Sequence, residues 1–212
     1  MRLPAPPLLV ISDRQQARRP LEEIADAVFA GGCRWFSLRE KDLPPAERYA
    51  LLRALVVLGR PWGVTVTVHE DIDAAVMAGA AGVHLPSGGN PEAVRSRLPD
   101  ALIGASAHSA EEASALLHAG ADYVTISPVF LTDSKPGYGP AVGLDGLADI
   151  VVQTPGPVIA LGGISAENAA LCRSAGARGV AVMGEIMRAA DPRSVVEAIL
   201  REISGVKSAG TK

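Results

Sequence analysis

The chain has 212 residues, a formal net charge of −3 and 48 % hydrophobic residues, but only 4 % aromatic ones. This length fits one domain, and the shortage of aromatic residues leaves Ala, Val, Leu and Ile to fill the core, as in α/β proteins with buried parallel strands. The charge balance, without a basic stripe, argues against nucleic acid as a partner, and no apolar run is long enough to span a bilayer.

Eight short apolar segments predict buried strands, which we place at residues 8–12, 33–38, 63–68, 81–85, 101–106, 122–126, 157–161 and 178–182. Every second strand follows an Ala-Gly pair; these pairs begin at Ala30, Ala78, Ala119 and Ala175. A glycine that ends a helix adopts the left-handed conformation without steric cost, so each pair indicates a turn from helix to strand.

Polar residues mark the starts of several helices between the strands. Helix N-caps are predicted at Asn90, Ser109, Ser165 and Asp191, with Ser109 and Glu112 forming a capping box. Alternation of strands and helices with short connections predicts parallel strands. We therefore expect a single (β/α)8 TIM barrel over residues 1–205 and a flexible tail at 206–212. An open, doubly wound sheet is the structural alternative.

The termini and cysteines bear on the cell compartment. The apolar stretch near the N-terminus is broken by prolines and lacks the features of a signal peptide. Cys33 and Cys172 are far apart and have no metal-binding spacing, so we interpret them as buried thiols of a cytoplasmic protein.

In a barrel of this kind the active site lies on the loops that follow the strands. After the second strand, Ser37, Arg39 and Lys41 share one side of the chain, and two cations at a barrel mouth suit a phosphate or pyrophosphate. The alternative is a solvated loop in which Glu40 neutralises its neighbours.

Acidic residues follow the third strand. Glu70, Asp71 and Asp73 could hold a hard cation such as Mg2+, or they could be the ordinary acids of a helix start. Farther along, His84 could be a buried, hydrogen-bonded histidine or part of the site, and Ser106 could hydrogen-bond a ligand at the mouth.

The last three loops predict phosphate binding. Residues 127–139 form a long loop that combines hydroxyl groups with Lys135, and its Gly and Pro content is typical of a lid. Gly163, after the seventh strand, and Gly184, after the eighth, match the place where barrels bind phosphate through backbone N–H groups.

These residues, in this order, resemble the thiamine-phosphate synthase family and the related thiazole tautomerase family. The resemblance covers nearly the whole chain and is carried by LREK (38–41), GVHLP (82–86), SAHS (106–109), ADYVTISPVF (121–130), TDSK (132–135), VIALGGIS (158–165) and AGARGVAVM (175–183). It implies a (β/α)8 barrel enzyme that couples an aminopyrimidine pyrophosphate to a thiazole phosphate and releases pyrophosphate.

The resemblance also implies roles for individual residues. Pyrophosphate binding and catalysis would fall to Arg39, Lys41, Ser106 and Lys135. Substrate binding would fall to Thr132, Ser134, Gly163 and Gly184. From their places at the strand ends we add Ser37, His69 and Met183, although the family usually has Gln in place of Ser37 and an Asn-Asp pair in place of His69 and Glu70. Mg2+ would be held by Glu70, while Gly89 stands where the family has a second metal-binding carboxylate.

Three functions therefore remain open. The first is a thiamine-phosphate synthase. The second is a thiazole tautomerase-like isomerase, favoured by the loop at 85–91, although Pro128 stands where that branch has its acid/base histidine. The third is a non-catalytic thiazole-phosphate binder. The expected partners are small phosphorylated ligands, not nucleic acid or a membrane, and a homodimer is the assembly we consider.

Overall fold

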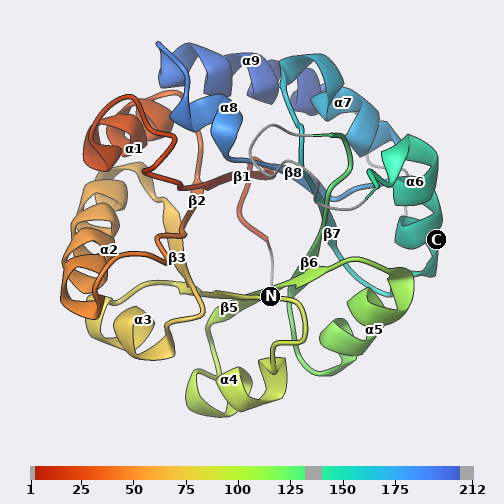
Figure 1. Cartoon of the computed structure of the whole chain (residues 1–212), viewed down its shortest axis with the longest axis horizontal. Coiled ribbons are helices and arrows are strands. Elements are labelled where there is room, and N and C mark those ends of the chain that lie inside the picture. The colour runs from red at the N-terminus through yellow and green to blue at the C-terminus, as the bar shows by residue number, and fades with distance from the viewer. Residues whose placement is uncertain (1–2, 132–139, 206–212) are drawn as a thin grey trace.

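The computed structural model, which describes residues 3–131 and 140–205, has a closed barrel of eight parallel strands (Figure 1). The strands pair in chain order, and the last pairs with the first. They are β1 (Leu8–Ile11), β2 (Trp35–Leu38), β3 (Thr65–His69), β4 (Gly82–Leu85), β5 (Leu102–Ala107), β6 (Tyr123–Ile126), β7 (Val158–Leu161) and β8 (Gly179–Val182). Each predicted strand is confirmed, and closure excludes the open sheet.

Helices form a ring around the barrel (Figure 1). They are α1 (Leu21–Ala30), α2 (Pro45–Gly59), α3 (Ile72–Ala78), α4 (Pro91–Arg97), α5 (Ala110–His118), α6 (Gly143–Gln153), α7 (Ala166–Ser174), α8 (Gly184–Met187) and α9 (Pro192–Ser204), with a 3-10 turn, η1, at Arg60–Trp62. The four predicted N-cap side chains all accept a backbone N–H. The return bond of Glu112, however, comes from the backbone of His108, not from the Ser109 cap.

Apolar residues form two cores. The larger lies between the strands and the helices and includes the buried, unbridged Cys33 and Cys172, as predicted. The smaller fills the inside of the barrel and consists of Leu9, Ile11, Trp35, Leu102, Tyr123, Ile159 and Ala181. Leu3 packs against this inner cluster from the segment that precedes β1. Within the described ranges, no helix is both long and apolar enough to cross a membrane.

Candidate functional site

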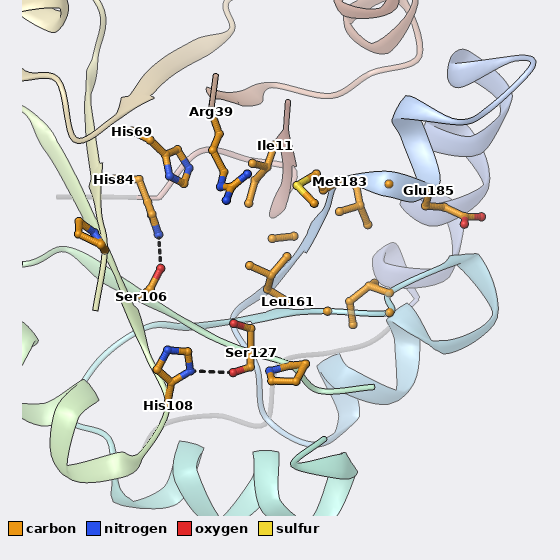
Figure 2. Close-up of a pocket in the computed structure, with 18 of the residues that line it drawn as sticks. Ile11, Arg39, His69, His84, Ser106, His108, Ser127, Leu161, Met183 and Glu185 are labelled. Carbon is orange, nitrogen blue, oxygen red and sulfur yellow. Dashed lines mark hydrogen bonds between the residues drawn. The ribbon is translucent and has the colours of Figure 1, made fainter. Parts of the chain in front are cut away.

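A cavity of about 420 Å³ lies at the C-terminal ends of the strands. Each of the eight strands, or the residues directly after it, contributes to the lining: Ile11, Arg39, His69, His84, Ser106, Ser127, Leu161 and Met183 (Figure 2). The barrel therefore brings residues that are far apart in sequence around one space, at the end where barrel enzymes carry their chemistry.

The cationic side of the cavity follows β2. Arg39 and Lys41 both line the cavity, and the backbone N–H of Arg39 donates to Ser12 Oγ over 2.8 Å. Lys41 Nζ lies 2.8 Å from Glu70 Oε2. Both cations are thus held at the mouth, one through its backbone and one through an ion pair.

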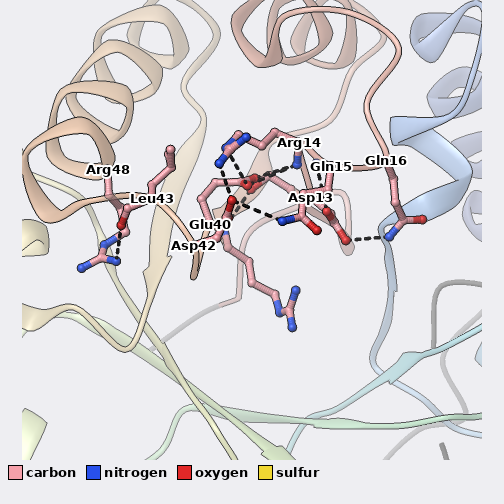
Figure 3. A network of polar contacts seen from close by, with 10 residues as sticks. Asp13, Arg14, Gln15, Gln16, Glu40, Asp42, Leu43 and Arg48 are labelled. Atoms are coloured by element: carbon pink, nitrogen blue, oxygen red, sulfur yellow. Dashed lines mark hydrogen bonds and ion pairs between the residues drawn. The ribbon is translucent and has the colours of Figure 1, made fainter.

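Glu40, between these two cations, turns the other way. Its carboxylate is only 3 % exposed and accepts the backbone N–H of Arg14 with both oxygens, at 3.1 and 3.2 Å (Figure 3). Burial raises its pKa, although hydrogen bonds from Ser12 and Arg14 act against that rise. Glu40 therefore ties the loop after β2 to the loop after β1, and it is Glu70 that pairs with Lys41.

Glycine backbone forms the opposite side. Gly162, Gly163 and Gly184 line the cavity. Gly163 has a φ of 63°, and a Cβ there would lie 2.6 Å from the carbonyl oxygen of Leu131. Asn168 fixes this turn because its side chain donates to the Gly163 carbonyl over 2.8 Å. The tight turn brings the main chain to the cavity wall just before α7.

Apolar side chains occupy the middle of the lining. Ile11, Leu161 and Met183 lie between the Arg39 side and the Glu185 side of the cavity (Figure 2). A ligand that spans the cavity would therefore meet Arg39 and Lys41 at one end, apolar surface in the middle, and glycine backbone with the charged Glu185 and Arg188 at the other end.

The predicted site residues fall into three groups. The cavity lining includes Arg39, Lys41, His69, Ser106, Gly163, Met183 and Gly184. Ser37 is fully buried and is absent from this lining, and within the described part of the chain its Oγ has no hydrogen-bond partner. Thr132, Ser134 and Lys135 lie outside the described residues. Ser127, the first residue of the loop at 127–139 singled out from the sequence, also lines the cavity, whereas sequence reasoning missed Ile11, Leu161 and Arg188.

The acidic residues after β3 line a neighbouring cleft, and each has a cationic partner. Besides the Glu70–Lys41 pair, Asp71 lies 2.7 Å from Arg48 and Asp73 lies 2.6 Å from Arg97. Asp71 is also the N-cap of α3; although burial acts to raise its pKa, the Ala74 N–H and Arg48 bring the pKa below its ordinary value.

The residues present do not fit a protein-held Mg2+. A Cβ on Gly89 would lie 2.7 Å from Leu85 Cβ, so this backbone leaves no room for a carboxylate there. Across residues 3–131 and 140–205, no three His, Cys, Asp or Glu side chains gather into a metal-binding group. Glu70, the residue expected to hold Mg2+, pairs in the described structure with Lys41 and not with a second metal-binding carboxylate.

Comparison with known proteins identifies the family. Residues 8–186 match the thiamine monophosphate synthase family. The chain belongs to this family. A putative thiamine-phosphate synthase of Geobacter sulfurreducens is 41 % identical over 196 residues, which cover 91 % of this chain and 92 % of the relative. A thiamine-phosphate synthase of Roseiflexus sp. is 38 % identical over 193 residues, covering 90 % and 82 %.

The fold of this family member also matches a solved relative. Thiamine phosphate pyrophosphorylase from Pyrococcus furiosus superposes with a TM-score of 0.84 at 33 % identity, covering 93 % of this chain and 95 % of that one. The resemblance seen in the sequence motifs is therefore confirmed at the level of both family and fold.

Proposed function

We propose that this protein is a thiamine-phosphate synthase, which couples an aminopyrimidine pyrophosphate to a thiazole phosphate and releases pyrophosphate. The observation that carries the proposal is the polarity of the cavity in a chain of this family, with two cations on one side, glycine backbone on the other and apolar residues between them. Two phosphorylated substrates whose uncharged rings meet in the middle match this arrangement.

The reaction needs no nucleophile from the protein. The bond from the pyrimidine methylene to pyrophosphate breaks, and its electron pair leaves on the pyrophosphate. The lone pair of the thiazole nitrogen then forms the new C–N bond to the pyrimidine cation. The protein therefore contributes orientation and stabilisation of charge.

Each side of the cavity has its own task in this mechanism. Arg39 and Lys41 stabilise the charge that develops on the leaving pyrophosphate, assisted by Ser106 and Lys135. The thiazole phosphate is held by Thr132, Ser134 and the backbone of Gly163 and Gly184. Ile11, Leu161 and Met183 keep water from the pyrimidine cation, which water would otherwise capture.

The alternative functions make different demands on the cavity. A tautomerase needs a proton carrier, but Pro128, which lines the cavity, has none. Burial, with Arg39 and Lys41 nearby, lowers the pKa of His84 to about 3, which leaves His69 and His108 as histidines for that task. A non-catalytic binder needs only the glycine backbone on one side of the cavity, which would hold the thiazole phosphate.

The deciding experiment is an assay of thiamine phosphate formation by the purified protein with both substrates, with and without added Mg2+. Product formation that falls strongly in Arg39→Ala and Lys135→Ala is the expected result. No product, together with calorimetric binding of thiazole phosphate, would overturn the synthase and leave the isomerase or the binder.

A further inference from the structure

A chain of hydrogen bonds inside the barrel leads to Ser106. His84, on β4, is 1 % exposed. Its Nδ1 lies 3.1 Å from the Tyr123 hydroxyl, and its Nε2 lies 3.1 Å from Ser106 Oγ (Figure 2) and 3.5 Å from Thr125 Oγ1. The chain thus runs from a fully buried tyrosine on β6, through His84, to a hydroxyl at the cavity wall.

The ring of His84 is neutral at physiological pH, since burial and the charges of Arg39 and Lys41 lower its pKa to about 3. A neutral imidazole has one N–H donor and one acceptor nitrogen. The direction of every bond in the chain therefore depends on which of the two nitrogens carries the proton.

Tyr123 favours one of the two tautomers. Its ring packs edge-on against Trp35, with centroids 4.7 Å apart, and lies so close to Gly104 that a Cβ there would be 2.1 Å from the ring. In the described part of the chain, His84 Nδ1 is the hydrogen-bond partner of the fully buried Tyr123 hydroxyl. A buried phenol satisfies its proton only by donating it, so Nδ1 is the acceptor and the proton of His84 is on Nε2.

The position of that proton sets the polarity of Ser106. When Nε2–H donates to Ser106 Oγ, the serine proton is free to point into the cavity, toward an anionic oxygen. In the opposite tautomer the serine would donate to Nε2 and would present only lone pairs to the anion. The first arrangement attracts a pyrophosphate oxygen and the second repels it.

We propose that His84 is a positioning residue: together with Tyr123 it orients the Ser106 hydroxyl as a donor to the leaving pyrophosphate. The inference rests on the proposed function in one respect, the placing of pyrophosphate at Ser106. Tyr123 is hydrogen-bonded to His84 and not to Ser106, so it acts on the serine only through the histidine. Thr125, the more distant partner of Nε2, is the matched control within the same layer of the barrel.

The tautomer can be measured directly. In protein labelled with 15N-histidine, two-bond 1H–15N correlation spectra distinguish a proton on Nδ1 from one on Nε2, and the signal missing from His84→Gln assigns His84 among the 4 histidines. We expect the neutral Nε2–H form in the wild type. An Nδ1–H form, or a charged ring at pH 7, would overturn the inference.

Binding of inorganic pyrophosphate, measured by calorimetry, tests the consequence. We expect Tyr123→Phe, which keeps the ring packing, to weaken binding about fivefold, as for the loss of one hydrogen bond. Thr125→Val should change binding by less than about twofold. The effect of Tyr123→Phe should vanish in a Ser106→Ala background, because both substitutions remove the same donor.

Two variants of His84 separate positioning from packing. The amide N–H of Gln reaches about as far as Nε2, whereas that of Asn reaches only about as far as Nδ1. We therefore expect His84→Gln to retain more pyrophosphate binding, and a lower KM for the pyrimidine substrate, than His84→Asn. Equal losses in both, or a Tyr123→Phe effect that persists without Ser106, would overturn the inference.

Failure of the proposed function would look different. A wild-type protein that forms no thiamine phosphate contradicts the synthase, yet the tautomer and the Tyr123–Ser106 coupling can still be read with pyrophosphate alone. A wild-type protein that binds no pyrophosphate overturns the proposed role of His84.

Discussion

Lys41 Nζ lies 2.8 Å from Glu70 Oε2, so the residue predicted to bind pyrophosphate and the residue predicted to bind Mg2+ pair with each other. Both side chains are about half exposed, so their attraction is modest. Glu70 is also the non-glycine residue with positive φ, 62°, among those described. This conformation is costly for a residue with a Cβ, and it places the carboxylate beside Lys41.

Substitution of Glu70 by Gly therefore has two expected effects. The free energy of unfolding should rise by about 1 kcal/mol, because glycine adopts positive φ without strain. Pyrophosphate should bind several-fold more tightly, because Lys41 loses its competing partner. Thermal unfolding and calorimetry measure the two effects. A large loss of Mg2+-dependent turnover would instead show that Glu70 holds the metal.

The buried Glu40 should give the protein a pH-dependent stability. Its pKa is raised in the folded protein, so the contribution of this group is fully present below its ordinary pKa of 4.5 and is lost as pH rises through the raised value. We expect Glu40→Gln to flatten this fall in unfolding free energy, measured by urea denaturation at a series of pH values. A pH profile identical to that of the wild type would contradict this account.

Removal of the Glu40 side chain tests its role as a tie between loops. Glu40→Ala leaves the backbone N–H of Arg14 without its acceptor and should lower the free energy of unfolding by about 2 kcal/mol. Asp42→Asn is the control, because it weakens an exposed ion pair of the same arginine and an exposed hydrogen bond from the Gln15 amide, and it should cost less than about 1 kcal/mol. Similar losses in both variants would mean that Glu40 has no special role.

Gly163 and Gly79 have nearly the same backbone but different surroundings. Their φ values are 63° and 67°; a Cβ at Gly163 would meet the Leu131 carbonyl, whereas a Cβ at Gly79 would meet nothing within 4 Å. Each change to Ala should cost about 1 kcal/mol of stability from backbone strain, and Gly163→Ala should cost more than Gly79→Ala because its Cβ would clash with the Leu131 carbonyl. Only Gly163→Ala should raise the KM for thiazole phosphate, by about tenfold if one charge-assisted hydrogen bond is lost. An unchanged KM would remove Gly163 from the phosphate site.

Two buried hydroxyls face each other in register across β2 and β3. In the described part of the chain, neither Ser37 Oγ nor Thr67 Oγ1 has a hydrogen-bond partner. We expect Thr67→Val and Ser37→Ala each to raise the free energy of unfolding by about 1 kcal/mol, because each removes a polar atom that is buried without a partner. A rise in the KM for the pyrimidine substrate in Ser37→Ala alone is what a substrate-binding role predicts; destabilisation in both would show that these hydroxyls are satisfied.

The sequence predicted the barrel because its signals are local. Apolar segments of strand length and the glycine turns between them determine where each element begins and ends, and closure then carries Arg39 and Gly163 to the same mouth. The alternation of inward and outward side chains along β2 predicts that Ser37 and Arg39 point to the same side. It does not predict how deep each lies, because successive residues on one face of a strand occupy successive layers of the barrel. Ser37 is in the buried layer and Arg39 lines the cavity.

Contacts between side chains on different loops could not be predicted from the sequence. The pairing of Lys41 with Glu70 depends on the distance between the loops after β2 and β3, which no motif encodes. His84 was predicted to be either a buried histidine or part of the site; it is buried and also lines the cavity, because the barrel interior continues into the cavity floor. Arg188 follows a four-residue helix and no sequence pattern marks it.

The packing of Leu3 against the inner cluster has a consequence for how ligands enter and leave the barrel. Side chains such as Leu9 and Trp35 fill the interior of the barrel, so among residues 3–131 and 140–205 they leave no passage from one end to the other. In the described structure, molecules can therefore enter and leave the cavity only at the carboxyl end of the barrel. The products of one turnover depart from the same end at which the substrates of the next arrive.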